Sequence, residues 1–168
     1  MAKVARIIDS ISDWSGKLFG FLVYPGVLII VYEVVVRYAF DAPTIWAYGT
    51  SQRIFAVYFV IGGAYALLYN AHIRVDVIYE KFSLRTRMLI DILITTPLLF
   101  AICFVLLWHG GEFAWDSLSY LEVCDTPFHA PVYPVKIMVP LAGLLLLLQG
   151  LASLYRYVVT LVTGKETQ

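Results

Sequence analysis

Residues 69–87 have the sequence YNAHIRVDVIYEKFSLRTR and separate two long apolar segments of the chain. This stretch contains four of the chain's 12 lysine and arginine residues, namely Arg74, Lys81, Arg85 and Arg87. Basic residues close to the ends of membrane-spanning segments favour the cytoplasmic side. If the neighbouring apolar segments cross a membrane, this stretch predicts which side the connection faces.

The overall composition indicates that these segments do cross a membrane. Hydrophobic residues make up 61% of the 168 residues and charged residues only 14%, whereas about 25% charged residues is typical of soluble domains. So few charges cannot shield so much apolar surface from water, which makes lipid the expected solvent. A formal net charge of zero argues against nucleic acid as a partner.

Four apolar segments are long enough to span the bilayer. About 20 helical residues cross the hydrocarbon layer of about 30 Å, and helices satisfy every backbone hydrogen bond inside lipid. We therefore predict an all-α integral membrane protein with four transmembrane helices. It forms a single membrane domain over residues 1–168, with spans at approximately residues 18–36, 50–71, 90–110 and 135–157.

The distribution of the other basic residues agrees with the orientation. With four spans, nine of the 12 basic residues lie on the side of residues 69–87, and three lie on the opposite side. Both termini and this connection are therefore predicted to be cytoplasmic. The connection over residues 110–133 is predicted to face outward, and it is rich in acidic residues.

Two more segments are predicted to form short interfacial helices. Near the N-terminus, apolar residues recur at helical spacing and charged residues occupy other faces, which is typical of an amphipathic helix. Its apolar positions are Ile7, Ile11, Trp14 and Leu18. A frayed tail is the alternative for this segment. In the connection after the third span, the apolar positions of the second short helix are Phe113, Trp115, Leu118 and Leu121.

Glu33 and Arg37 are the charged pair of the first span. Their spacing of four residues places them on one helix face, with the acid nearer the N-terminus, the better order for pairing. A lone acid inside a membrane helix would suggest proton or cation coupling. With Arg37 one turn away, we favour a structural ion pair, and an anchor for a partner protein is the second interpretation.

His72, Arg74 and Asp76 alternate at the inner end of the second span. A zinc site on a helix needs two histidines one turn apart and further ligands, so no metal is expected here. Arg74 close to lipid phosphates and a polar cluster that docks a neighbouring subunit are the two interpretations. A haem bridge is excluded because His72 and His109 lie at opposite depths and His129 lies in a loop.

No nucleophile constellation, phosphate-binding loop or pair of intramembrane carboxylates is visible, which argues against an enzyme. Cys103 lies in an apolar run and Cys124 in a polar loop, which argues against a disulfide framework. Gln149, in the fourth span, is expected to form a hydrogen bond across a helix interface. Trp46 belongs to a set of aromatic residues at predicted outer ends, as in a membrane aromatic belt.

In their order along the chain, these features resemble the small membrane subunit of the tripartite ATP-independent periplasmic (TRAP) transporters, the DctQ-like proteins. The similarity covers approximately residues 14–156. The motifs that carry it are EVVVRY at 33–38, Pro43 with Trp46, GGAYAL at 62–67, AHIRVD at 71–76, Arg85, Arg87, Asp91, Pro131, Tyr133-Pro134, Lys136, Pro140 and LLQG at 147–150. Family members often carry an acid shortly after the tryptophan, and residues 47–50 of this chain contain none.

The resemblance implies a non-enzymatic subunit of the bacterial inner membrane. Its implied partners are membrane lipids, a periplasmic substrate-binding protein, and a large membrane subunit that imports organic acids by a sodium-driven elevator motion. The small subunit would brace the stationary part of that partner. Sodium is expected in the large subunit, and no catalytic residue, metal or cofactor is expected in this chain. The residues expected at subunit or lipid interfaces are Glu33, Arg37, Trp46, His72, Arg74, Asp76, Arg85, Arg87, Lys136 and Gln149.

Two other functions compete with this interpretation. The first is an autonomous four-span exporter with a membrane-embedded glutamate in its first span, for which Glu33 is the only candidate residue. The second is a membrane anchor for a redox enzyme. An exporter would transport substrate by itself, whereas a scaffold subunit would require its partners.

Overall fold

The computed structural model describes residues 2–69 and 82–163, and this part of the chain is almost entirely helical. Its elements are α1 (Ala2–Gly20), α2 (Val23–Ala39), α3 (Ala47–Leu68), α5 (Leu84–Ile90), the π-helical turn η1 (Asp91–Thr95), α6 (Thr96–Ser119) and α7 (Tyr133–Thr163). Four helical stretches are long and apolar enough to cross a membrane. The all-α, four-span prediction is therefore confirmed.

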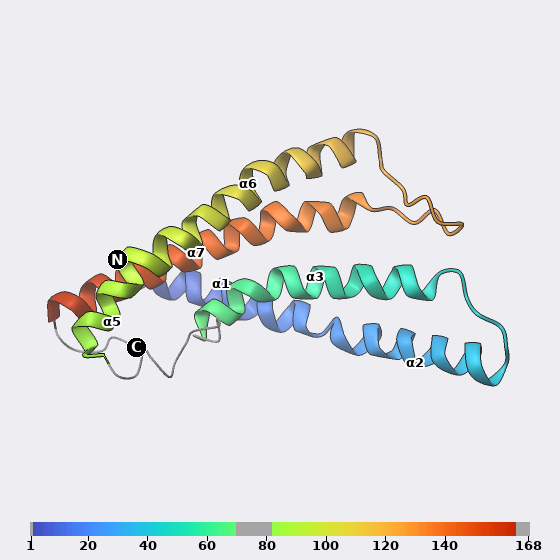
Figure 1. Ribbon diagram of the computed structural model, residues 1–168, viewed down its shortest axis with the longest axis horizontal. Helices are drawn as coiled ribbons and strands as arrows, with labels where there is room; N and C mark the ends of the chain where they lie inside the picture. Colours follow the sequence, from blue (N-terminus) through green and yellow to red (C-terminus); the bar gives the residue numbers. More distant parts are fainter. Residues whose placement is uncertain (1, 70–81, 164–168) are drawn as a thin grey trace.

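The helices run back and forth along one long axis (Figure 1). The loops over residues 40–46 and 120–132 lie at one end of the molecule, and the ends of α3 and α7 lie toward the other. The start of α1 and the start of α5 also lie toward that second end. An even number of spans thus brings both described ends of the chain to the same side, while the side of the membrane stays a prediction.

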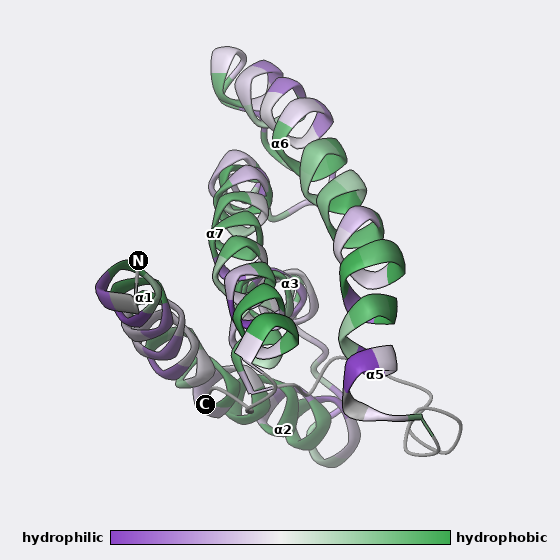
Figure 2. Ribbon diagram, turned by 90° about the vertical axis from the view of Figure 1, so that its left-hand side faces the viewer, coloured by the Kyte–Doolittle hydropathy of each residue, from purple (hydrophilic) through white to green (hydrophobic). Residues whose placement is uncertain are grey.

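Three of the four helical stretches are longer than the predicted spans, and Ala47–Leu68 has about the same length as its span. The first stretch, Lys3–Ala39, has 37 residues, or about 55 Å of helix against about 30 Å of hydrocarbon. The third, Arg85–Ser119, has 35 residues. In Figure 2, hydrophobic residues dominate the middle of α6, while hydrophilic residues gather toward its far end and on α5. The polar ends therefore extend beyond the apolar segments.

The two expected short helices have different outcomes. The amphipathic N-terminal helix exists as α1, but it has 19 residues and meets α2 at a turn over residues 21–22, so it continues the first span. A separate helix around Phe113 is wrong, because α6 continues without a break to Ser119. Gly110 and Gly111 do not end α6. Gly110 lies so close to α7 that an added Cβ would be 2.9 Å from Val139.

The core lies where α7 packs between α6 and α3. Its buried side chains are Ile61, Ala64, Leu67, Cys103, Ala142, Leu145 and Leu146. Small residues of α7 bring α6 close, since a Cβ added to Gly143 or Gly150 would lie 2.9 Å from Leu106 or Leu99. Close backbone approach at small residues is how membrane helices gain packing contacts. By contrast, α2 packs mainly on α3 and buries only Gly26 and Glu33.

Candidate functional site

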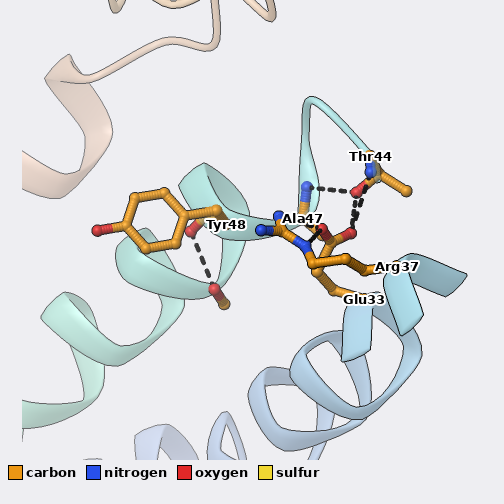
Figure 3. A network of polar contacts seen from close by, with 6 residues as sticks. Glu33, Arg37, Thr44, Ala47 and Tyr48 are labelled. Atoms are coloured by element: carbon orange, nitrogen blue, oxygen red, sulfur yellow. Dashed lines mark hydrogen bonds and ion pairs between the residues drawn. The ribbon is translucent and has the colours of Figure 1, made fainter. Parts of the chain in front are cut away.

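Glu33 is the centre of a polar network at the loop end of α2 (Figure 3). Arg37 donates to Glu33 Oε1 from Nε at 3.0 Å and from Nη2 at 2.5 Å. Thr44 donates to Glu33 Oε2 from its backbone N–H at 3.2 Å and from its hydroxyl at 2.5 Å. The predicted ion pair is confirmed, and its carboxylate is bound by donors on both oxygens.

This network holds the turn that leads into α3. The Thr44 hydroxyl also accepts a hydrogen bond from the backbone N–H of Ala47 at 3.3 Å, in the first turn of α3. Trp46 stacks on Tyr32 of α2, with ring centroids 5.9 Å apart. Sequence reasoning missed Thr44, although a threonine just before a helix is a common capping signal. The arrangement joins the end of α2 to the start of α3, so its role is structural.

Gln149 is the centre of a second network, between α7 and α1. It is fully buried, it accepts from the Ser12 hydroxyl at 2.8 Å, and it donates to Asp9 Oδ1 at 3.0 Å. Arg156 binds the same Asp9 carboxylate with both terminal nitrogens, at 2.9 and 3.0 Å. The predicted hydrogen bond across a helix interface is confirmed. Because Gln149 has no exposed surface, it bonds inside the subunit and does not line a subunit or lipid surface.

Asp13 is the acid of a third network, which joins α1 to the end of α3. Lys17 lies 2.6 Å from Asp13 Oδ2, and the Tyr69 hydroxyl donates to Asp13 Oδ1 at 2.8 Å. The polar side of α1 therefore faces the protein, while its apolar residues Ile7 and Trp14 are exposed.

Lys136 belongs to a fourth network, at the loop over residues 120–132. Its ammonium forms an ion pair with Glu122 and lies 3.9 Å from the centroid of the Phe113 ring. This partner lowers the pKa of the Glu122 carboxyl below its usual range. Nearby, Arg53 of α3 donates to the Ala130 carbonyl at 3.4 Å. Side chains of this chain therefore hold the loop to α3 and α7, and Lys136 also contacts α6 through Phe113.

The other predicted interface residues lie at the opposite end. Arg85 is exposed in the first turn of α5, and Arg87 donates from Nε to the Phe82 carbonyl at 2.9 Å. His72, Arg74 and Asp76 lie outside the described residues. Their proposed role at a subunit or lipid surface stays a prediction.

The described residues offer no metal site. Within residues 2–69 and 82–163, no group of three or more His, Cys, Asp or Glu side chains is placed to hold a metal ion. The four networks instead consist of carboxylates already bound by Arg, Lys, Thr, Tyr or Gln. These contacts hold helices and loops of the subunit to one another.

Comparison with protein families gives a match over residues 26–160 to the family described as "Tripartite ATP-independent periplasmic transporters, DctQ component". The match covers well over half of the chain, including two of the four spanning helices in full and the other two in part. The chain therefore belongs to this family of transporter components. Comparison with curated protein sequences gave no match.

Proposed function

We propose that the chain is the non-catalytic small membrane subunit of a sodium-driven TRAP transporter for organic acids, and that it braces the large subunit. The observation that carries this proposal is the use of its polar side chains. At both ends of the helices, acids are bound by partners on neighbouring segments, as with Glu33 by Arg37 and Thr44, and Asp9 by Gln149 and Arg156. This pattern suits a rigid frame, and it provides no translocation path.

A brace must resist movement along the membrane normal. Charged groups at both ends of the spans provide that resistance, because moving an arginine or aspartate to the bilayer centre costs about 2.5–3.5 kcal/mol or more. Arg85 and Arg156 lie at one end, and Glu112 and Asp116 lie at the other. The nine-to-three distribution of basic residues supports N-in and C-in topology in the bacterial inner membrane.

The autonomous exporter gains no support from the family match. The geometry of Glu33 also argues against it. Its two oxygens accept from Arg37 and Thr44, and its side chain is only 12% exposed. A proton carrier must exchange protons with water, whereas both oxygens of this carboxylate already accept hydrogen bonds from donors of the chain.

Reconstitution tests the proposed function directly. The chain, a polytopic large subunit and a periplasmic binding protein are combined in proteoliposomes, and sodium-dependent uptake of a labelled organic acid is measured. We expect uptake with all three proteins, and loss of uptake when any one of them is omitted. Transport by the chain alone, or full transport without it, would contradict the proposal.

Glu33→Gln distinguishes the scaffold from the exporter. In a scaffold, the substitution should weaken assembly with the large subunit and reduce uptake in proportion to the complex that remains. Glu112→Gln is the control, because that side chain is 61% exposed and bonds only to His109 one turn away among the described residues. Normal assembly with abolished proton coupling would favour the exporter.

A further inference from the structure

A pocket lies where the start of α3 meets the loop over residues 120–132 (Figure 1). Its volume is about 310 Å³, at the lower end of the range of about 300–1,000 Å³ that is usual for small-molecule sites. Helix α3 contributes Tyr48, Gly49 and Arg53 to its wall, and the loop contributes Cys124 among other residues. None of the described residues that line the pocket is an acid, so Arg53 is its charged group.

Arg53 differs from Arg156 and Lys136, which are similarly half-buried, because it has no acidic partner. Each of those two residues forms an ion pair with a carboxylate, whereas Arg53 forms none with any described residue. Its guanidinium instead contacts the Cys124 thiol and the Ala130 carbonyl, at 3.4 Å, longer than is usual for a hydrogen bond. A half-buried charge without a counter-ion is unfavourable, so this guanidinium favours an anion in the pocket.

Gly49 determines where the guanidinium of Arg53 lies. A Cβ added to Gly49 would be 2.9 Å from Arg53 Nη1, so the absence of a side chain leaves the space beside the guanidinium open. Gly49 belongs to the first turn of α3, and the N-terminal end of a helix carries a partial positive charge. The guanidinium and the helix end repel each other and both attract negative charge, which makes this part of the pocket suitable for an anion.

The other lining residues indicate which kind of anion fits. The Tyr48 hydroxyl accepts from Gln52 Nε2 at 2.9 Å, so its own O–H can donate, and a guanidinium with a further donor suits a carboxylate. Apolar side chains make up most of the remaining lining, namely Ile45, Ala56, Phe128, Val132 and Val135. We propose that the pocket binds a small organic carboxylate, with its carboxylate on Arg53 and an apolar substituent against these side chains. Such a site would be additional to the substrate site expected in the large subunit.

Protection of Cys124 from alkylation tests the site in the full-length chain. Cys124 lines the pocket, and the other cysteine, Cys103, is fully buried. The chain in mild detergent is treated with iodoacetamide, and the alkylation rate is measured by intact-protein mass spectrometry at constant ionic strength. Saturating isocaproate should slow alkylation by about tenfold or more, whereas its neutral analogue isocaproamide should slow it by less than about twofold. Equal protection by the two compounds would overturn the proposal.

The contribution of Arg53 is measured with a charged and a neutral reagent. Iodoacetate carries a carboxylate and iodoacetamide does not, and the ratio of their rate constants cancels any change in the thiolate fraction of Cys124. We expect Arg53→Gln to lower this ratio by about tenfold or more and to remove protection by isocaproate. Arg6→Gln, the same change at an exposed arginine of α1, is the matched control and should alter the ratio by less than about twofold. An unchanged ratio in Arg53→Gln would also overturn the proposal.

The position of the guanidinium is tested without removing a charge. Gly49→Ala places a methyl group where it displaces Arg53 Nη1, and it should raise the half-protecting concentration of isocaproate by about threefold or more. Gly62→Ala is the control on the same helix, because nothing lies within 4 Å of its added Cβ. Equal half-protecting concentrations in the two variants would contradict a carboxylate held on Arg53.

Discussion

Glu33 and Gln149 show how single residues act in this protein. Each is a polar group within an apolar segment, and each is bound by partners on a second helix or loop. In a membrane, such hydrogen bonds have nearly the same small energy as in water, about 1 kcal/mol or less on average. Several such contacts lie at the ends of helices that already pack together, and jointly they fix how these helices are arranged.

Ser12 provides a matched test of the α1–α7 network. It is buried and donates to Gln149, whereas Ser10 is exposed on the same helix. We expect Ser12→Ala to lower the free energy of unfolding by about 1 kcal/mol, because it leaves Gln149 one hydrogen bond short. Ser10→Ala should change it by less than about 0.5 kcal/mol. Equal effects of the two substitutions, measured by denaturant titration in mixed micelles, would contradict this.

The ion pair between Glu122 and Lys136 should make the free energy of unfolding depend on pH. Lys136 lowers the pKa of the Glu122 carboxyl from the ordinary value of 4.5. The ion pair therefore adds stability above about pH 4.5, and this is lost as the pH falls through the lower pKa of the folded state. The stability difference between the unsubstituted chain and Glu122→Gln should be constant from pH 6 to 8 and shrink below about pH 4.5. Lys136→Met should remove the same dependence, and a difference that grows in acid would refute it.

At the scale of elements, α1 is the segment that differs most from the sequence prediction. Its amphipathic pattern was predicted from Ile7, Ile11, Trp14 and Leu18, and these side chains are exposed as expected for a lipid-facing side. The opposite side is packed on α3 and α7 through Ser12 and Gly16. Helical periodicity separates the two sides of α1, but it does not indicate that the polar side meets protein.

Gly16 and Gly20 test how α1 docks on α3. A Cβ on Gly16 would lie 2.1 Å from the Tyr65 ring, whereas nothing lies within 4 Å of a Cβ on Gly20. Gly16→Ala should force α1 from α3 and cost about 1–3 kcal/mol, as overpacking does. Gly20→Ala should be neutral or slightly stabilising. The readout is the thermal melting temperature with protease protection of α1, and unchanged protection in Gly16→Ala would exclude the tight contact.

At the scale of the whole molecule, the four helices form a frame with an apolar exterior and polar ends. The second, third and fourth spans hold the core, and α2 is attached to it mainly through α3. This uneven packing leaves most side chains of α2 exposed. The orientation of the frame follows from charge distribution alone and can be tested on a native residue.

Cys124 reports which side the loop over residues 120–132 faces. Hydrogen bonds from Thr126 lower the pKa of its thiol from the ordinary value of 9.0, which increases the fraction of reactive thiolate at neutral pH. A membrane-impermeant maleimide should therefore label Cys124 in spheroplasts without permeabilisation. Cys124→Ser is the control, since the remaining Cys103 is fully buried. Labelling that requires permeabilisation would reverse the topology.

The sequence by itself determined the class of the protein, its four spans, their order and the Glu33–Arg37 pair. The length of an apolar run decides whether a segment spans the bilayer, and the charges beside it decide which side each end faces, so both can be predicted one segment at a time. A pair one helical turn apart depends only on helix geometry. Hydropathy indicates which part of each helix lies within lipid, whereas the helix itself continues until a turn ends it, as α6 does at Ser119.

Only the tertiary structure decided which distant residues meet. Asp9 and Arg156 are 147 positions apart, yet they form a two-pronged ion pair beside Gln149. Packing of α1 on α7 produces that contact, and no spacing along the chain encodes it. The same holds for the close approach of Gly26 of α2 to the Phe55 ring of α3. Local pattern specifies helices in lipid, and the fit of side chains between helices specifies where they touch.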